Sequence, residues 1–404
     1  MIETQKHTAT RITSAPVNKE KHQKVFFPNL DGLRFICFLL VFLFHSFKTI
    51  FENLRHTPGN ETVYSVAQFL FQNGELGVNF FFVLSGFLIT YLLIKEKELT
   101  GTVHLGNFYV RRILRIWPLF YLCVIIGFLV VPFLKSMAGA SPSEIARPLY
   151  YIFFVNNYDY IQGWPAFPDA LILIVLWSVA VEEQFYITWP VILKYVPKKI
   201  YPLVFIAIIL FTLVFRSFYT GDSDHDSAVR HFHTFAVIGD MALGGLMAFY
   251  CSYKSPFLNF ITDLKKWQIL FIYAGALAII LFRKGLFETP VAIVFERIII
   301  ATFFGLIILE QNYSRNSFYK FSRLKTLSKL GLYTYGLYCL HFFVISLIQT
   351  ASGKIGVQIN NGTMAILATV FALATVTGLC ILSFNYFEKP FLKLKDRFAF
   401  ITRT

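Results

Sequence analysis

The chain has 404 residues, of which 56% are hydrophobic and only 15% are charged. In a soluble protein of this length about a quarter of the residues are charged, so this composition excludes an ordinary soluble enzyme. The net charge of +14 raises the alternative of a nucleic-acid partner. Lys and Arg nevertheless fall in short clusters between apolar runs, as expected of loops that face anionic lipid. The composition therefore predicts a polytopic membrane protein whose partner is the lipid bilayer, with no nucleic acid.

Ten apolar runs are long enough to cross roughly 30 Å of hydrocarbon as helices. They cover residues 30–50, 75–94, 109–134, 173–195, 200–218, 232–250, 267–283, 291–310, 331–350 and 363–387. One further run, 149–155, has only about half the length of a crossing. We expect an all-α polytopic membrane protein with about ten transmembrane helices.

The distribution of Lys and Arg predicts the orientation in the membrane. If the basic N-terminal tail is cytoplasmic, most Lys and Arg lie on that side, as the positive-inside rule requires. This holds only if the 149–155 run does not cross, so we assign it as a re-entrant or interfacial segment on the outer side. Both termini are then cytoplasmic. We expect a disordered tail over 1–28, a membrane domain over 29–391 and a basic tail over 392–404, with no soluble domain.

The first span carries polar side chains that are costly inside a membrane. Arg34 and His45 are eleven residues apart, close to three helical turns, so they share one face with a rise of roughly 16 Å between them. Asp31 is a candidate substrate-binding residue, although a simple ion pair with Arg34 at the helix start is an equally good interpretation. His45 follows an entirely apolar run, and imidazole suits proton transfer near neutral pH. We therefore interpret His45 as catalytic, with a local capping role as the alternative.

The third span begins with three arginines, Arg111, Arg112 and Arg115, which share one sector of a helix at its cytoplasmic mouth. Forked guanidinium groups are well matched to phosphates. Anchors that snorkel to the membrane surface explain the spacing equally well. We take the three arginines, together with Arg34, as candidate ligands of a phosphate-bearing donor.

Two adjacent carboxylates, Glu182 and Glu183, lie inside the fourth span, 173–195, without a local cation, so a purely structural role is difficult to assign to them. Ser178 and Glu182 fall on one helix face, whereas Glu183 points about 100° away. Glu182 is the candidate catalytic residue, and Ser178 and Glu183 are candidate substrate-binding residues. For His341 a hydrogen-bonded structural role is favoured, with substrate binding as the alternative.

Other polar residues and motifs add little. His231, His233 and Asp240 stand at the outer mouth of the 232–250 span and could touch an acceptor. The chain has no dinucleotide-binding, P-loop or nucleophile-elbow motif. Its five cysteines have neither zinc spacing nor a disulfide pattern, so we expect no metal and read them as small core residues.

Six stretches carry a family resemblance. They are residues 30–34 with His45, then 77–90, 108–115, 176–186, 336–341 and 386–390. In this order they resemble the acyltransferase-3 family of bacterial inner-membrane O-acyltransferases, which modify hydroxyls of cell-surface glycans and related acceptors. The resemblance implies a helical fold of about ten spans and a bacterial inner-membrane location. Asn79 departs from the pattern, because many relatives have Asp there.

The resemblance also implies roles for particular residues. Arg34 and His45 correspond to the hallmark pair of the family, and Arg112 and Arg115 to the motif associated with the acyl-coenzyme A donor. Glu182 corresponds to the first carboxylate of the family's Glu-Glu-Gln-Phe-Tyr motif. In this hypothesis an acyl group, expected to be acetyl, moves from cytoplasmic acyl-CoA to a hydroxyl of a carbohydrate or lipid-linked saccharide. His45 takes the acceptor's proton or carries the acyl group covalently, and Glu182 orients the imidazole.

The alternative hypothesis is a proton-coupled transporter or flippase. Arg34, His45, Glu182 and Glu183 would then form a proton relay for an exported acid or saccharide. No inverted repeat is evident in the sequence, which makes this alternative the weaker one.

Overall fold

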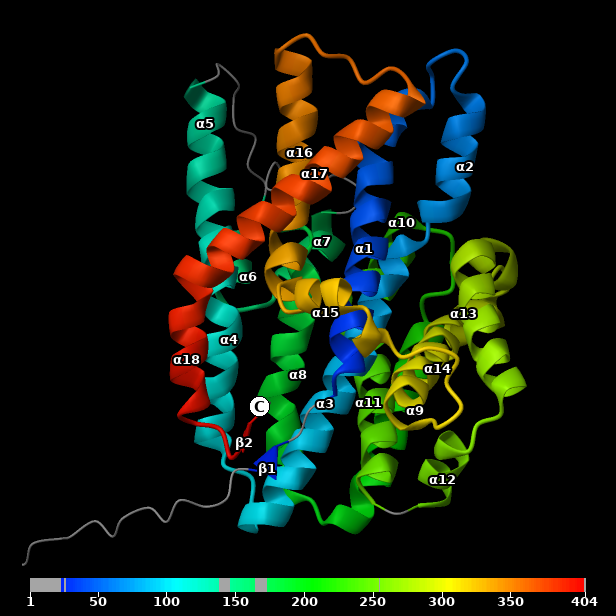
Figure 1. The fold of residues 1–404 in the computed structure, drawn as a ribbon, viewed down its shortest axis with the longest axis vertical. Coiled ribbons are helices and arrows are strands. Elements are labelled where there is room, and N and C mark those ends of the chain that lie inside the picture. The colour runs from blue at the N-terminus through cyan, green and yellow to red at the C-terminus, as the bar shows by residue number, and fades with distance from the viewer. Residues whose placement is uncertain (1–22, 25–26, 138–145, 164–172, 254, 403–404) are drawn as a thin grey trace, which may run out of the picture.

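The computed structural model describes residues 23–24, 27–137, 146–163, 173–253 and 255–402 (Figure 1). The described part is a bundle of helices, so the predicted all-α class is confirmed. Two short strands, β1 (Gln23–Lys24) and β2 (Ile401–Thr402), pair in parallel and bring segments near the two ends of the chain together. Most of the tail predicted over 1–28 lies outside the described residues, and the three predicted region boundaries stay predictions.

The long helices correspond one to one with the ten predicted spans. They are α1 (Asn29–Thr49), α3 (Gly77–Thr100), α4 (Leu105–Ile125) continued by η3 (Ile126–Val130) and α5 (Val131–Met137), α8 (Leu176–Tyr195), α9 (Tyr201–Ser217), α11 (Thr234–Ser252), α13 (Lys266–Leu286), α14 (Pro290–Tyr313), α16 (Thr334–Lys354) and α17 (Gly362–Ser383). Nine helical segments of the described chain are long and apolar enough to cross a membrane. The tenth predicted span, α8, is not among these nine segments and carries Glu182 and Glu183.

Shorter helices connect these spans. They are η1 (Phe51–Leu54), α2 (Glu61–Phe71), η2 (Gly74–Leu76), α6 (Pro148–Ile152), α7 (Asn156–Gly163), η5 (Lys198–Ile200), α10 (Asp224–Phe232), α12 (Pro256–Thr262), η6 (Phe321–Arg323), α15 (Lys325–Gly331), η7 (Phe384–Glu388) and α18 (Lys389–Asp396). The run 149–155 forms most of α6 and the turn after it. A helix of five residues is too short to cross, in agreement with the assignment of this run as a segment that does not span.

The helices divide into a buried centre and an apolar outside. α1, α3 and α11 are mostly buried inside the bundle, whereas fewer than a third of the residues in the apolar segments of α9, α13 and α17 are buried. On α17, for example, Leu367, Val370 and Phe371 are all exposed. Large exposed apolar patches are expected where side chains face lipid rather than water. All five cysteines are free and buried, as the sequence predicts for small core residues.

Glycines allow α3 and α11 to approach closely. A Cβ added to Gly86 would lie 2.0 Å from the backbone oxygen of Met241, and one added to Gly244 would lie 2.1 Å from that of Val83. No real side chain tolerates these distances, so the two backbones would have to separate. Small residues at crossing points are a general means of packing membrane helices. The close pair matters for the site, because α3 forms a wall of both cavities described below.

Replacing Gly86 with alanine is therefore expected to destabilise the fold by about 3 kcal/mol, the upper end of the cost of overpacking. Thermal unfolding of the purified protein in detergent measures this loss. Gly378 is the matched control, because it lies inside α17 with open space around its Cα. Gly378→Ala should change stability by less than about 1 kcal/mol. Equal unfolding temperatures for the two variants would contradict this account of the α3 and α11 contact.

Candidate active site

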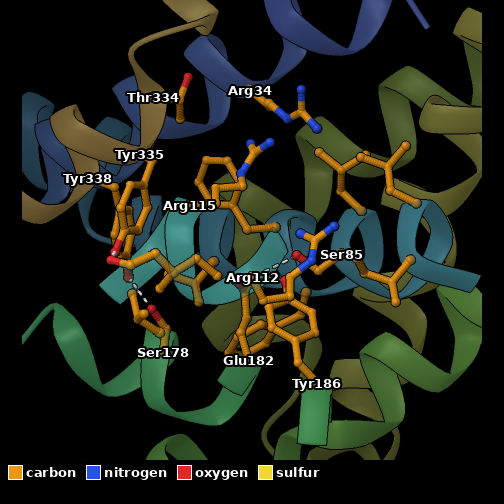
Figure 2. Close-up of a pocket in the computed structure, with 18 of the residues that line it drawn as sticks. Arg34, Ser85, Arg112, Arg115, Ser178, Glu182, Tyr186, Thr334, Tyr335 and Tyr338 are labelled. Atoms are coloured by element: carbon orange, nitrogen blue, oxygen red, sulfur yellow. Dashed lines mark hydrogen bonds between the residues drawn. The ribbon is translucent and has the colours of Figure 1, made fainter. Parts of the chain in front are cut away.

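A first cavity of about 210 Å³ lies between α1, α3, α4, α8 and the start of α16. Arg34 reaches it from α1, and Arg112 and Arg115 reach it from α4 (Figure 2). Three of the four arginines expected to bind a donor thus face one space, although they come from different helices. Ser178 and Glu182 line the same cavity from α8, as their predicted shared face requires.

The arginines of the first cavity differ in their partners. Arg34 donates to Asp31 over 2.8 Å, so the ion pair expected at the start of α1 is present. Arg112 lies against the rings of Phe108 and Tyr186, 5.4 and 5.3 Å from their centroids. The buried Nε of Arg112 has no hydrogen-bond partner among the described residues. A buried guanidinium without a full set of acceptors is suited to an anionic ligand that supplies them.

Arg111 corrects the sequence interpretation, which placed all three arginines of the third span in one sector. Its guanidinium donates to Glu96 over 2.9 Å and to the backbone oxygen of Phe398 over 2.6 Å. Arg111 does not line the first cavity. Glu96 is buried and lies on the last turns of α3, so it attracts the nearest cation away from the cavity. Arg111 therefore joins α3, α4 and the C-terminal segment instead of extending the arginine cluster.

Glu182 also lies differently from the expectation. Its carboxylate accepts from the Ser85 hydroxyl over 2.6 Å and from the Tyr186 hydroxyl over 3.1 Å. These bonds hold it in the first cavity (Figure 2), whereas His45 lines a second one. Among the contacts of the described residues there is none between Glu182 and the imidazole of His45. The expected orientation of His45 by Glu182 is therefore not formed here, and a catalytic role of Glu182 stays a prediction.

Glu183 points away from both cavities. Its carboxylate accepts from Trp117 Nε1 over 3.0 Å and is buried between α4 and α8. This agrees with the predicted rotation of about 100° from Glu182 on the same helix. A substrate-binding role for Glu183 would need an opening that neither cavity provides. The substrate-binding role stays a prediction, whereas the hydrogen bond from Trp117 explains Glu183 as a link between α4 and α8.

A second cavity, of about 600 Å³, contains His45. It is lined by residues of α1, η2, α3, α8, α9, α10, α13, α14 and α16. The His45 ring lies 4.8 Å from Phe342 and 5.2 Å from His341, measured between centroids. His45 is half-buried and faces the cavity, so a substrate in this space could reach it.

His341 is fully buried beside His45. Its Nδ1 lies 2.7 Å from the backbone oxygen of Tyr338. Because a carbonyl oxygen can only accept, Nδ1 is the protonated nitrogen in this bond. The hydrogen-bonded structural interpretation of His341 is therefore supported, and its direct contact with substrate stays a prediction.

Tyr338 and Val78 line both cavities, so the two spaces meet at these side chains. The Tyr338 hydroxyl lies 2.7 Å from the Ser178 hydroxyl, a bond that Figure 2 shows at the edge of the first cavity. No sequence pattern distinguishes Tyr338 from its neighbouring tyrosines, Tyr333 and Tyr335. Tyr338 stands where the two cavities meet. The arginines of the first cavity and His45 of the second therefore lie in adjoining cavities and not in a single one.

The second cavity also contains charged residues that sequence reasoning did not assign to a site. They are Lys48, Glu75, Arg216, Arg230, Arg283, Glu296 and Arg297. Among these residues, Arg297 is the one whose functional role the sequence could have indicated, because it lies inside an apolar span, where a cation is energetically costly. Asn79 also lines this cavity and donates to Asp240 over 3.2 Å. Because residue 79 is Asn and not Asp, an amide rather than a second carboxylate lies beside Asp240.

Comparison with known proteins gives a consistent assignment. A family model described as an acyltransferase domain matches residues 27–384, which include both cavities. The chain is 26% identical over 388 residues to a peptidoglycan O-acetyltransferase, OatA, of Listeria monocytogenes, covering 92% of this chain and 57% of that protein.

A second relative, an O-acetyltransferase OatA of Staphylococcus aureus, is 27% identical over 403 residues, covering 94% of this chain and 59% of that protein. The chain thus spans just under three fifths of the length of these curated relatives. No solved structure matches the chain. Because the family model covers most of its length, the chain belongs to the acyltransferase domain family and is a bacterial membrane protein.

Proposed function

We propose that the chain is a membrane O-acyltransferase that moves an acyl group, in particular acetyl, from acyl-CoA to a hydroxyl of a carbohydrate or lipid-linked saccharide. The observation that carries this proposal is the pair of adjoining cavities, one with three arginines and the other with His45, which meet at Tyr338. The names of the relatives support acetyl as the group and a saccharide such as peptidoglycan as the acceptor.

In this proposal Arg34, Arg112 and Arg115 bind the phosphates of the donor in the first cavity. Charge-assisted bonds from guanidinium to phosphate are strong and directional. The pantetheine arm then extends toward Tyr338, and its thioester reaches the neighbourhood of His45. The rise of roughly 16 Å between Arg34 and His45 along α1 suits such an extended arm.

The chemistry assigned to His45 balances in either of two routes. In the first, its imidazole removes the proton of the acceptor hydroxyl, whose oxygen attacks the thioester carbonyl and releases coenzyme A as a thiol. In the second, an imidazole nitrogen attacks the thioester carbonyl and expels coenzyme A, which leaves as a thiol with the proton of the ring. The acceptor oxygen then takes the acyl group from the ring, and the acceptor's proton returns to the imidazole. Both routes require the imidazole to stand where donor and acceptor meet.

We also place both termini in the cytoplasm of a bacterial cell, with the protein in the inner membrane. Pairing of β1 with β2 supports one common side for the two ends, and the Lys and Arg distribution supports the cytoplasmic side. The first cavity then takes its donor from the cytoplasm, where acyl-CoA is made. The second cavity, farther along α1, faces the outer side and takes the saccharide.

Membranes from a bacterium that overproduces the chain provide the test. Supplied with acetyl-CoA labelled in the acetyl group, they are expected to place label in a saccharide fraction as esters that mild alkali releases. Mild alkali separates these esters from N-acetyl groups, which resist it. Membranes without the chain are the control. Solute uptake coupled to a pH gradient, without cleavage of the thioester, would contradict the proposal and favour a transporter.

A further inference from the structure

The charge lining the second cavity is unbalanced. Among its described lining residues there are five cations and two carboxylates, namely Lys48, Arg216, Arg230, Arg283 and Arg297 against Glu75 and Glu296. Such an excess is costly in a space surrounded by membrane-spanning helices, because the low dielectric strengthens repulsion between like charges. A ligand that brings negative charge would reduce this cost.

The carboxylates in and behind the wall are already engaged. Glu296 accepts from Arg283 over 2.5 Å and from Arg216 over 3.3 Å, and Glu75 accepts from Arg283 as well. Asp240, just behind the wall, accepts from Arg297 over 2.6 Å. The acidic side chains therefore neutralise three of the arginines and leave none for the two other cations.

Lys48 and Arg230 form no ion pair with a carboxylate of the described residues. Arg230 donates instead to the backbone oxygens of Tyr219 and Gly221, each over 2.7 Å, which fixes its position without neutralising its charge. Lys48 is exposed on the last turn of α1, one turn from His45. Both cations thus retain their full charge at a cavity that also contains the candidate catalytic imidazole.

Arg297 lines the same cavity and has unfilled hydrogen-bonding capacity. Only 8% of its surface is exposed, and its Nε has no hydrogen-bond partner among the described residues. Buried donors are nearly always satisfied in folded proteins, so this guanidinium is suited to further acceptors. Carboxylate and phosphate oxygens are the acceptors that a guanidinium binds best.

We infer that the second cavity is an anion subsite and that the acceptor is an acidic saccharide, bearing a carboxylate or a phosphate group. The inference rests on the proposed function, in which the acceptor hydroxyl lies at His45. The anionic group of the same acceptor then lies among Lys48, Arg230 and Arg297. The cations then select the acceptor and hold its hydroxyl toward the imidazole. A neutral saccharide would leave their charge uncompensated and binds more weakly.

Binding in the absence of acetyl-CoA tests the inference separately from catalysis. The intact chain is placed in nanodiscs of phosphatidylcholine, and tryptophan fluorescence is followed, because Trp177 lines the second cavity. Matched probes are methyl glucuronide against methyl glucoside, and N-acetylglucosamine 1-phosphate against N-acetylglucosamine. At least one acidic probe should bind about tenfold tighter than its neutral match, with the difference reduced by salt. Trp177→Phe should remove the signal.

Single substitutions then locate the subsite. Lys48→Gln should weaken binding of the acidic probe by about threefold to fivefold, as expected for one exposed charge, and leave the neutral probe unchanged. Lys48→Glu should weaken it by about tenfold or more. Lys354→Gln is the matched control, since Lys354 is an exposed lysine at the end of α16 that does not line the cavity. It should have no effect.

The outcomes separate the two proposals. Equal binding of acidic and neutral probes, or no fluorescence change with any acidic probe, would overturn the anion subsite and leave acyl transfer untouched. If phosphatidylglycerol in the nanodisc produces the change and the acidic sugars do not, the cations bind a lipid headgroup and the inference is wrong. Selective binding of acidic probes by a chain that never cleaves acetyl-CoA would support the subsite and count against the proposed function alone.

Discussion

Replacing His45 with alanine is expected to lower acetyl transfer by about 10²- to 10⁴-fold, the usual contribution of a positioned proton-transfer group. The reason is that His45 is the side chain of α1 suited to proton transfer near neutral pH that faces the second cavity, which shares Val78 and Tyr338 with the first. Alkali-labile acetyl esters formed by membranes of equal protein content measure the loss. Gel filtration of the detergent-solubilised variant checks that it is folded.

His56 is the matched control for this substitution. It is an exposed histidine in the turn after η1 and lies outside both cavities, so His56→Ala should keep full activity. If His45→Ala remains folded in the membrane and forms esters at the normal rate, the assigned role of the imidazole is wrong. Labelled acetyl retained on the wild-type protein when no acceptor is present would favour the covalent route over the general-base route.

Arg112→Gln is expected to raise the KM for acetyl-CoA by about 10- to 100-fold, which corresponds to one charge-assisted hydrogen bond. The expectation follows from its unpaired Nε in the wall of the first cavity. A truncated donor without phosphates, S-acetyl-N-acetylcysteamine, provides the sharpest readout. Its rate of use should be the same for Arg112→Gln and the wild type, because the lost bond is to phosphate.

Arg111→Gln separates donor binding from a general loss of stability. Arg111 is bonded to Glu96 and Phe398 and does not line the cavity, so its variant should unfold at a lower temperature but keep the KM for acetyl-CoA. If Arg111→Gln and Arg112→Gln raise the KM for acetyl-CoA equally, the donor would have to bind the whole cluster of Arg111, Arg112 and Arg115. An unchanged KM for Arg112→Gln would remove the proposed phosphate contact.

Sequence patterns predicted the fold well because a membrane imposes strong and simple constraints. A run of about twenty apolar residues can satisfy its backbone polar groups in hydrocarbon only as a helix. All ten predicted runs are accordingly helices, and the run 149–155 is too short to cross. Helical periodicity also predicted that Ser178 and Glu182 share a face and that Glu183 points elsewhere, as their contacts confirm.

Periodicity says nothing of which helix a side chain will meet. Glu182 therefore lay on a correctly predicted face, but its partners proved to be Ser85 and Tyr186 instead of His45. Arg111 had the right spacing for a cluster and was drawn to the buried Glu96, fifteen residues earlier in the chain. The second cavity is the clearest case, since Arg283 meets Glu75 there across 208 residues of the chain, as well as Glu296 from the next helix.

In the proposed function the acetyl group passes from a donor on one side of the membrane to an acceptor on the other, through the two cavities that meet at Tyr338. Sealed right-side-out vesicles, loaded with acetyl-labelled acetyl-CoA, test this transfer. We expect labelled esters that a glycan acetyl-esterase, added outside and unable to enter, removes from intact vesicles. Esters that become accessible only after the vesicles are lysed, or that form only when the donor is added outside, would contradict it.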